Sequence, residues 1–109
     1  QKILDTNPER LFLVCAGTAE KMALEDTLGA GALCDLLWPN LEKAATDSAR
    51  LACGIYRKND MKLLEAASEA KNARHLLSIP ELAQDVEFCM QRDTHPVIGS
   101  MNTDGSITI

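Results

Sequence analysis

The sequence from Arg10 to Ala16 reads RLFLVCA, and the expected fold depends on this stretch. A short run that is apolar on both faces is typical of a central strand in an α/β sheet, because helices cover both sides of such a sheet. Asn7-Pro8 interrupts the chain before the run, and Gly17 closes it. We therefore predict a buried strand over residues 10–16.

The first long helix is predicted over residues 24–38. This segment is apolar on nearly all sides, which is typical of a helix buried in a core. Pro39 is expected to end it. Gly29 and Gly31 lower its helix propensity, so we expect the helix to approach a neighbouring backbone closely enough to compensate.

Four shorter helices and a hairpin are expected downstream. Thr46 is a candidate N-cap for residues 47–58, Asp60 for a helix through Ala67, and Ser68 for one through Ser78, while Pro80 suits the first turn of a helix through Gln91. Asp104-Gly105 predicts a hairpin turn between strands at Val97-Ile98 and residues 106–109. These strands cannot close a sheet alone, so partner strands are expected upstream or on another chain.

Composition narrows the class of protein. The 109 residues are 46% hydrophobic and 25% charged, which suits one globular domain or part of one. A net charge of −5 with scattered Lys and Arg argues against nucleic-acid binding. The sequence has no secretory segment and no apolar run near the roughly 20 residues of a membrane helix, so we expect a cytoplasmic protein. Because the chain begins with Gln1, we expect it to be part of a longer protein.

The cysteines are expected to be free thiols. Cys15, Cys34, Cys53 and Cys89 are too far apart in sequence for the paired spacing of zinc sites. Each lies in an apolar stretch, which favours buried thiols over disulfides or metal ligands.

The strongest candidate site follows the predicted strand. Gly17 opens a loop whose amides could hold an anion, and Glu25 and Asp26 lie in the first turn of the next helix. Their carboxylates suit a hard cation such as Mg²⁺. Acidic residues in a first helical turn also complement the helix dipole without any further role, so both interpretations stay open.

A second group of candidates surrounds the end of the last predicted helix. Asp85 and Asp93 are further candidate metal ligands, and the planar fork of Arg92 suits a phosphate or sulfonate. Asp93 can equally be a turn residue, and Arg92 a cation that complements a helix C-terminus. His75 and His95 lack a paired nucleophile, so neither predicts a Ser-His or Cys-His catalytic site.

Several segments together resemble the C-terminal half of the 2-phosphosulfolactate phosphatase family. No single segment is distinctive, but their order and spacing are. They are Leu13-Val14-Cys15-Ala16-Gly17, Leu24-Glu25-Asp26, Ala30-Gly31-Ala32, residues 47–52, residues 73–77, residues 85–89 and Asp93. The loop at residues 18–23 and Ser78-Ile79-Pro80 depart from the family pattern, which puts a phosphate contact from that loop in doubt.

The resemblance implies a three-layer α/β/α fold with a mixed sheet, of which residues 1–109 are the helix-rich C-terminal portion. It also implies Mg²⁺-dependent hydrolysis of 2-phosphosulfolactate to sulfolactate and phosphate, a step of coenzyme M biosynthesis or related sulfonate metabolism. Glu25 and Asp26 are the expected catalytic residues, joined by Asp85 and Asp93 as metal ligands, with Gly17 and Arg92 binding substrate.

The expected partners are the substrate and either the N-terminal half of the same protein or a second copy. We expect residues 1–109 to be inactive without the N-terminal half. The alternative is a non-catalytic α/β interaction or oligomerisation domain.

Overall fold

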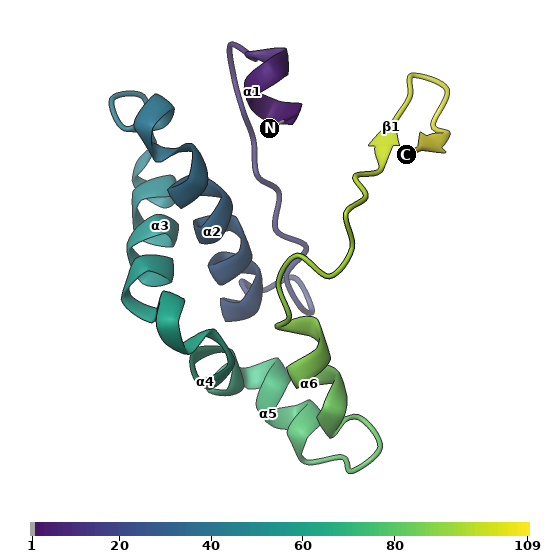
Figure 1. The fold of residues 1–109 in the computed structure, drawn as a ribbon. Coiled ribbons are helices and arrows are strands. Elements are labelled where there is room, and N and C mark those ends of the chain that lie inside the picture. The colour runs from purple at the N-terminus through teal and green to yellow at the C-terminus, as the bar shows by residue number, and fades with distance from the viewer. Residues whose placement is uncertain (1) are drawn as a thin grey trace.

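The computed structural model describes residues 2–109 (Figure 1). These residues are mostly helical and carry a small antiparallel sheet of two strands. The elements in chain order are α1 (Lys2–Thr6), α2 (Leu24–Leu41), α3 (Asp47–Asn59), the 3₁₀ turn η1 (Asp60–Lys62), α4 (Leu63–Ser68), α5 (Lys71–Leu77), α6 (Ala83–Cys89), β1 (Ser100–Met101) and β2 (Ile107–Thr108).

Helices α2 and α3 form an antiparallel pair, which Figure 1 shows side by side. The Thr46 side chain accepts a hydrogen bond from the Ala49 amide at 3.4 Å, so Thr46 is the N-cap that its sequence position predicted. Helix α2 continues past Pro39 to Leu41 because the Glu42 amide still bonds to the Trp38 carbonyl. The predicted helix end at Trp38 was therefore one turn too early.

The two helices touch at Gly31. A Cβ atom at this position would lie 2.2 Å from the Ala52 carbonyl oxygen and 2.7 Å from the Tyr56 Cβ atom. The expected close approach is thus confirmed for Gly31, whereas a Cβ at Gly29 would meet nothing within 4 Å. Leu28, Cys34, Leu37 and Cys53 are buried in the same interface.

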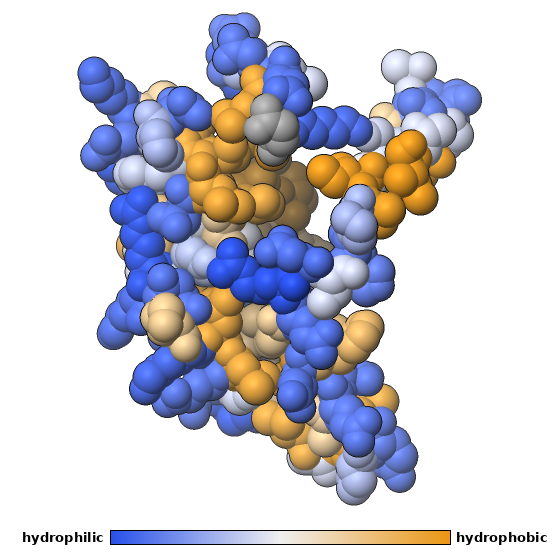
Figure 2. All heavy atoms as spheres, in the orientation of Figure 1, coloured by the Kyte–Doolittle hydropathy of each residue, from blue (hydrophilic) through white to orange (hydrophobic). Residues whose placement is uncertain are grey.

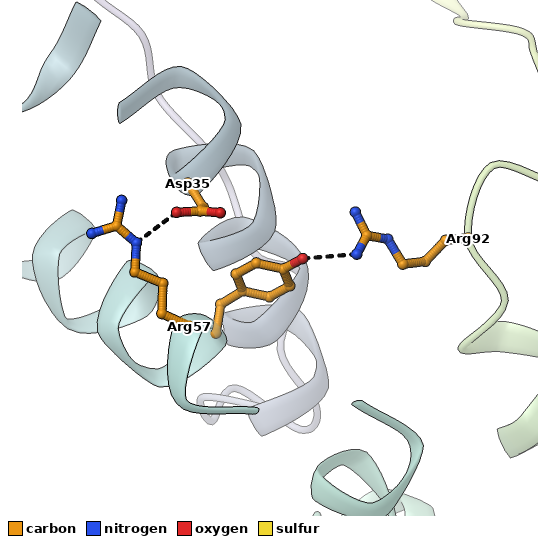
Figure 3. A network of polar contacts seen from close by, with 4 residues as sticks. Asp35, Arg57 and Arg92 are labelled. Carbon is orange, nitrogen blue, oxygen red and sulfur yellow. Dashed lines mark hydrogen bonds and ion pairs between the residues drawn. The ribbon is translucent and has the colours of Figure 1, made fainter. Parts of the chain in front are cut away.

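A cluster of charged and aromatic side chains fastens one side of this helix pair (Figure 3). Arg57 Nε donates to Asp35 Oδ1 at 2.5 Å, and this hydrogen bond raises the pKa of the guanidinium. The Arg57 and Arg50 guanidinium carbons lie 5.1 and 5.6 Å from the centre of the Trp38 ring. Both partners of the ion pair are part-exposed, so solvent screens the attraction between them.

A second small core joins α5 and α6. Ala70, Ala73 and Val86 are buried together, with Leu24 at the start of α2 packed against them. This contact places the end of α6 beside the first turn of α2.

The predicted strand at residues 10–16 is wrong for the chain as the structure describes it. The segment has no regular structure and pairs with no strand. Phe12 is 78% exposed and Val14 is 91% exposed, while Leu11 and Leu13 are half-buried. A strand needs a neighbour to bond its amides and carbonyls, and residues 2–109 supply none to this segment. The three-layer arrangement is accordingly not formed within these residues.

Other predictions also need correction. Ser68 ends α4 and bonds back to the Leu64 carbonyl, so it does not cap α5. Pro80 lies in a turn before α6 rather than in its first turn. The hairpin at Asp104-Gly105 is confirmed, with Ser100 opposite Thr108 and Met101 opposite Ile107. Its first strand begins at Ser100, not at Val97.

A large apolar surface is uncovered, so the prediction that α2 is buried on all sides is also wrong. Figure 2 shows apolar side chains gathered on both sides of a hollow in the molecule. Leu36 on α2 is 68% exposed, and Leu33 on the same helix is also exposed. Val97, Ile98, Met101 and Ile107 are exposed on the segment that follows α6. Among residues 2–109, no helix combines the length and the apolar character that crossing a membrane requires.

The four cysteines are free thiols, as expected, but only Cys34 and Cys53 are buried. Burial raises the pKa of both thiols, and a Cys53 thiolate would raise the pKa of Cys34 further. Cys15 and Cys89 are exposed.

This difference in exposure predicts two classes of thiol reactivity. Iodoacetamide at neutral pH should alkylate Cys15 and Cys89 in the native chain, whereas Cys34 and Cys53 should react only after unfolding, because the thiolate is the nucleophile and both thiols are buried and protonated. Mass spectrometry of peptides from the alkylated chain checks the order. Early alkylation of Cys34 or Cys53 would contradict the packing of α2 on α3.

Gly31→Ala tests the close approach of the two helices. The added methyl group collides with backbone, so we expect the free energy of unfolding to fall by about 1–3 kcal/mol. Gly54→Ala in α3 is the matched control, since a Cβ there meets nothing within 4 Å, and it should raise the free energy of unfolding by roughly 0.5–1 kcal/mol. Urea denaturation measures both changes. Equal effects of the two substitutions would refute the contact.

Candidate functional site

A cavity of about 340 Å³ opens where four elements meet, namely the first turns of α2, the end of α3, the start of α4 and the residues that leave α6. Its walls combine an apolar floor with two acids and one cation. The lining residues are Glu25, Asp26, Leu28, Gly29, Ala32, Tyr56, Leu63, Cys89, Met90, Gln91 and Arg92.

The first turn of α2 is tied to the loop that precedes it. The Gly17 amide donates to Asp26 Oδ2 at 2.7 Å, and the Cys15 thiol donates to the Asp26 carbonyl at 3.6 Å. Gly17 has a φ of +70°, and a Cβ there would lie 2.5 Å from the Lys21 carbonyl oxygen. Glycine is therefore required for the turn that brings this amide to the carboxylate.

The loop itself is a tight turn from Thr18 to Lys21. The amides of these two residues bond to each other's carbonyl oxygens at 2.9 and 3.1 Å. Ala19 and Glu20 occupy the turn with φ of 50° and 60°, a left-handed conformation that costs free energy in residues other than glycine. The loop thus holds Gly17 against Asp26 at some cost in strain.

Arg92 reaches the cavity from the chain that leaves α6. Its Nη1 donates to the Tyr56 hydroxyl at 2.8 Å, the bond that Figure 3 draws as a dashed line from Arg92. The guanidinium carbon lies 5.9 Å from the centre of the Tyr56 ring. Tyr56 is 5% exposed, so its hydroxyl is held in place by the α2–α3 packing.

The residues predicted from sequence are brought together in part. Glu25, Asp26 and Arg92 line one cavity, and Gly17 bonds to one of them. The Gly17 amide is occupied by Asp26, so its contribution in this state is to orient a carboxylate rather than to hold an anion. Asp85 is exposed on α6 and does not line the cavity.

Asp93 and the two histidines lie outside the cavity as well. Asp93 directly follows Arg92 but is exposed, with a φ of 57°. His75 lies exposed on α5, and His95 shares a hydrogen bond with the neighbouring Thr94 hydroxyl at 2.9 Å. Neither histidine lines the cavity.

The acids at the cavity suit a hard cation without forming a complete cage. Mg²⁺ commonly takes one or two carboxylates and completes its shell with water and substrate oxygens, and Glu25 and Asp26 offer such a pair. Within residues 2–109, no group of three or more His, Cys, Asp or Glu side chains is placed to hold a metal.

Tyr56 is the cavity residue that the sequence did not reveal. It lies 36 positions before its partner Arg92, and its place beside the buried residues Ala52 and Cys53 in α3 marks it only as a core residue. The available sequence signal was Gly31, because a glycine in a long apolar helix indicates that a neighbouring element packs closely against that position. In the structure, the Tyr56 Cβ lies against it.

Comparison with known proteins places these features in a family. The sequence profile of the 2-phosphosulpholactate phosphatases matches residues 1–104. A probable 2-phosphosulfolactate phosphatase of Caldicellulosiruptor saccharolyticus is 34% identical over 94 residues, which cover 85% of this chain and 38% of that protein. Proteins with the same name from Nostoc punctiforme and Thermotoga petrophila are 28% and 32% identical, over 96% and 85% of this chain and 44% and 39% of their own lengths.

The chain thus spans about two-fifths of the length of the curated relatives it matches, as the shares of 38%, 44% and 39% show. No solved structure matches it significantly. The profile nevertheless covers nearly the whole chain, from the segment before Gly17 through the cavity residues to the C-terminal hairpin. The chain belongs to the 2-phosphosulpholactate phosphatase family.

Proposed function

We propose that the protein carrying this chain is a Mg²⁺-dependent phosphatase that hydrolyses 2-phosphosulfolactate to sulfolactate and phosphate. The observation that supports this most directly is the shared cavity of Glu25, Asp26 and Arg92. Two acids and a cation facing one cavity suit a site where a metal ion and a phosphate ester meet. The names of the relatives specify the ester, and sulfolactate formation would place the enzyme in coenzyme M biosynthesis or related sulfonate metabolism.

In the proposed reaction, a water oxygen attacks phosphorus in line with the ester oxygen. The phosphorus–oxygen ester bond breaks, and one proton of the attacking water is transferred to the leaving oxygen, which becomes the hydroxyl of sulfolactate. Bound Mg²⁺ supplies charge neutralisation at the phosphate oxygens. Glu25 and Asp26 would hold the ion, and the Gly17 amide orients the Asp26 carboxylate through a hydrogen bond of 2.7 Å. Arg92 donates hydrogen bonds to the phosphate through its fork.

We also propose that residues 10–16 become a strand of a mixed sheet in a three-layer α/β/α enzyme. Their side chains alternate between half-buried and exposed over Leu11, Phe12, Leu13 and Val14, which is the period of a strand. The apolar surface on α2 would then pack within the same core. The partner is the remaining part of a family-length protein or a second copy of this chain, and residues 1–109 alone would be inactive.

The activity is tested with the protein that carries this sequence. We expect it to release phosphate from 2-phosphosulfolactate only with Mg²⁺, and more slowly from carboxylated phosphate esters that lack the sulfonate. Phosphate release is measured with and without EDTA. Turnover that is unaffected by EDTA, or equal for all the esters, would contradict the metal dependence or the substrate assignment respectively.

Glu25→Gln and Asp26→Asn test the proposed metal ligands. Each removes a charged oxygen ligand while keeping the shape of the side chain, so we expect kcat/KM to fall at least about 100-fold and the Mg²⁺ concentration for half-maximal rate to rise. Glu81→Gln, in the exposed turn before α6, is the matched control and should leave both values unchanged. Normal metal dependence in both cavity variants would remove Glu25 and Asp26 from the site.

Asp85→Asn and Asp93→Asn decide whether the acids near α6 belong to the same site. Neither side chain lines the cavity, so we expect each variant to keep its Mg²⁺ dependence and its kcat/KM within about threefold. Steady-state assays over a range of Mg²⁺ concentrations measure this. A large rise in the Mg²⁺ requirement of either variant would show that the end of α6 moves toward the ion in the active enzyme.

A further inference from the structure

Arg92 is held by a neutral partner rather than by an acid. Within the described residues, the ion pairs join Arg57 to Asp35 and Lys62 to Glu65, and neither includes Arg92. The bond to the Tyr56 hydroxyl fixes one of the five guanidinium N–H groups at 2.8 Å. A carboxylate in the same place would neutralise the positive charge, whereas a phenol leaves that charge available to a ligand.

Arg57 shows how an arginine with a purely structural role is held, and Arg92 is held differently. Arg57 is bound to Asp35 and lies near Trp38 on the outer side of the helix pair, as a structural clamp does. Arg92 lies in a segment without regular structure, which alone would leave its long side chain free to adopt many conformations. Figure 3 shows Arg57 of α3 bonded to Asp35 of α2, and Arg92 reaching the Tyr56 hydroxyl from a segment outside the helix pair.

The anchor itself is rigid. Tyr56 is 5% exposed, and its Cβ lies where Gly31 leaves room for it against α2. Tyr56 and Arg92 both line the cavity that Glu25 and Asp26 also line. A rigid buried hydroxyl therefore sets where a flexible cation sits relative to two acids.

We propose that Tyr56 is a positioning residue, whose hydroxyl holds the Arg92 guanidinium at the cavity so that it is pre-organised to bind the phosphate group of the ester. This inference rests on the proposed function, because it assigns Arg92 to the phosphate. Pre-organisation removes the cost of ordering a side chain at the moment of binding, so the loss of the hydroxyl weakens phosphate binding. Tyr56 does not touch the substrate.

Four versions of the full protein that carries this sequence test the proposal. They are the parent, Tyr56→Phe, Arg92→Met and the double variant. Tyr56→Phe keeps the buried ring and its contact with α2 and removes only the hydroxyl. The dissociation constant of inorganic phosphate is measured by calorimetry in each protein, and KM and kcat are measured with the phosphate ester. Thermal unfolding of each variant shows that it is folded.

We expect Tyr56→Phe to weaken phosphate binding roughly fivefold to tenfold, with a similar rise in KM and a kcat within about twofold of the parent. Arg92→Met should weaken binding further. The double variant should bind phosphate no more weakly than Arg92→Met alone, because a hydroxyl that acts only through Arg92 has nothing to position once Arg92 is gone.

Other results would overturn the proposal. Effects that multiply in the double variant would show that Tyr56 acts independently of Arg92, through packing or a contact of its own. Unchanged phosphate binding in Tyr56→Phe or in Arg92→Met, or a parent that does not bind phosphate, would also overturn it. Since the calorimetry needs no turnover, a parent that binds phosphate with the expected coupling but hydrolyses no ester would sink the proposed function and leave this positioning role standing.

Discussion

The contact of α2 with α3 at Gly31 is the constraint on which the rest of the described structure depends. Because residue 31 has no side chain, the Ala52 carbonyl and the Tyr56 Cβ can lie against the α2 backbone. This fixes the Tyr56 ring, and the ring fixes Arg92 at 2.8 Å from its hydroxyl. The absence of a side chain at residue 31 thus determines the position of the Arg92 guanidinium, 61 positions later in the chain.

The first turn of α2 is held by a different contact, between residues that are close together in the sequence. The strained turn at Ala19 and Glu20 brings the Gly17 amide to Asp26, so the carboxylate is oriented by a neutral donor. Arg92 is oriented by a neutral acceptor in the same way. Asp26 and Arg92 are therefore each held by a neutral partner. Neither of the ion pairs within residues 2–109, Arg57 with Asp35 and Lys62 with Glu65, includes them, which leaves their charges for ligands.

Elements that depend on near neighbours could be predicted from the sequence. Thr46 caps α3 because its hydroxyl needs only an amide three positions ahead, and Asp104-Gly105 forms a turn whose bonds lie within a few residues. Ser68 was misassigned because a serine can bond forward as a cap or back to a carbonyl four positions earlier, and the sequence does not distinguish the two. Gly17 and Asp26 could be grouped as candidates because only nine positions separate them in the chain.

Features that depend on distant residues could not be predicted in the same way. The bond between Tyr56 and Arg92 joins residues 36 positions apart, and no local pattern marks either one as the partner of the other. Asp85 and Asp93 were further candidate metal ligands, yet both are exposed and neither lines the cavity. Placement of this kind follows from how α6 packs, not from composition.

The segment at residues 10–16 shows where sequence and surroundings disagree. Its composition is that of a buried strand, but Phe12 and Val14 are 78% and 91% exposed. Successive side chains of this segment already alternate in burial, as they do in a strand. A strand also needs a neighbouring strand, because its backbone hydrogen bonds are made between two segments. The pattern and the exposed apolar face of α2 both support the proposed three-layer fold, in which a further layer covers them. The relatives, of which this chain spans 38–44%, have the length to supply it.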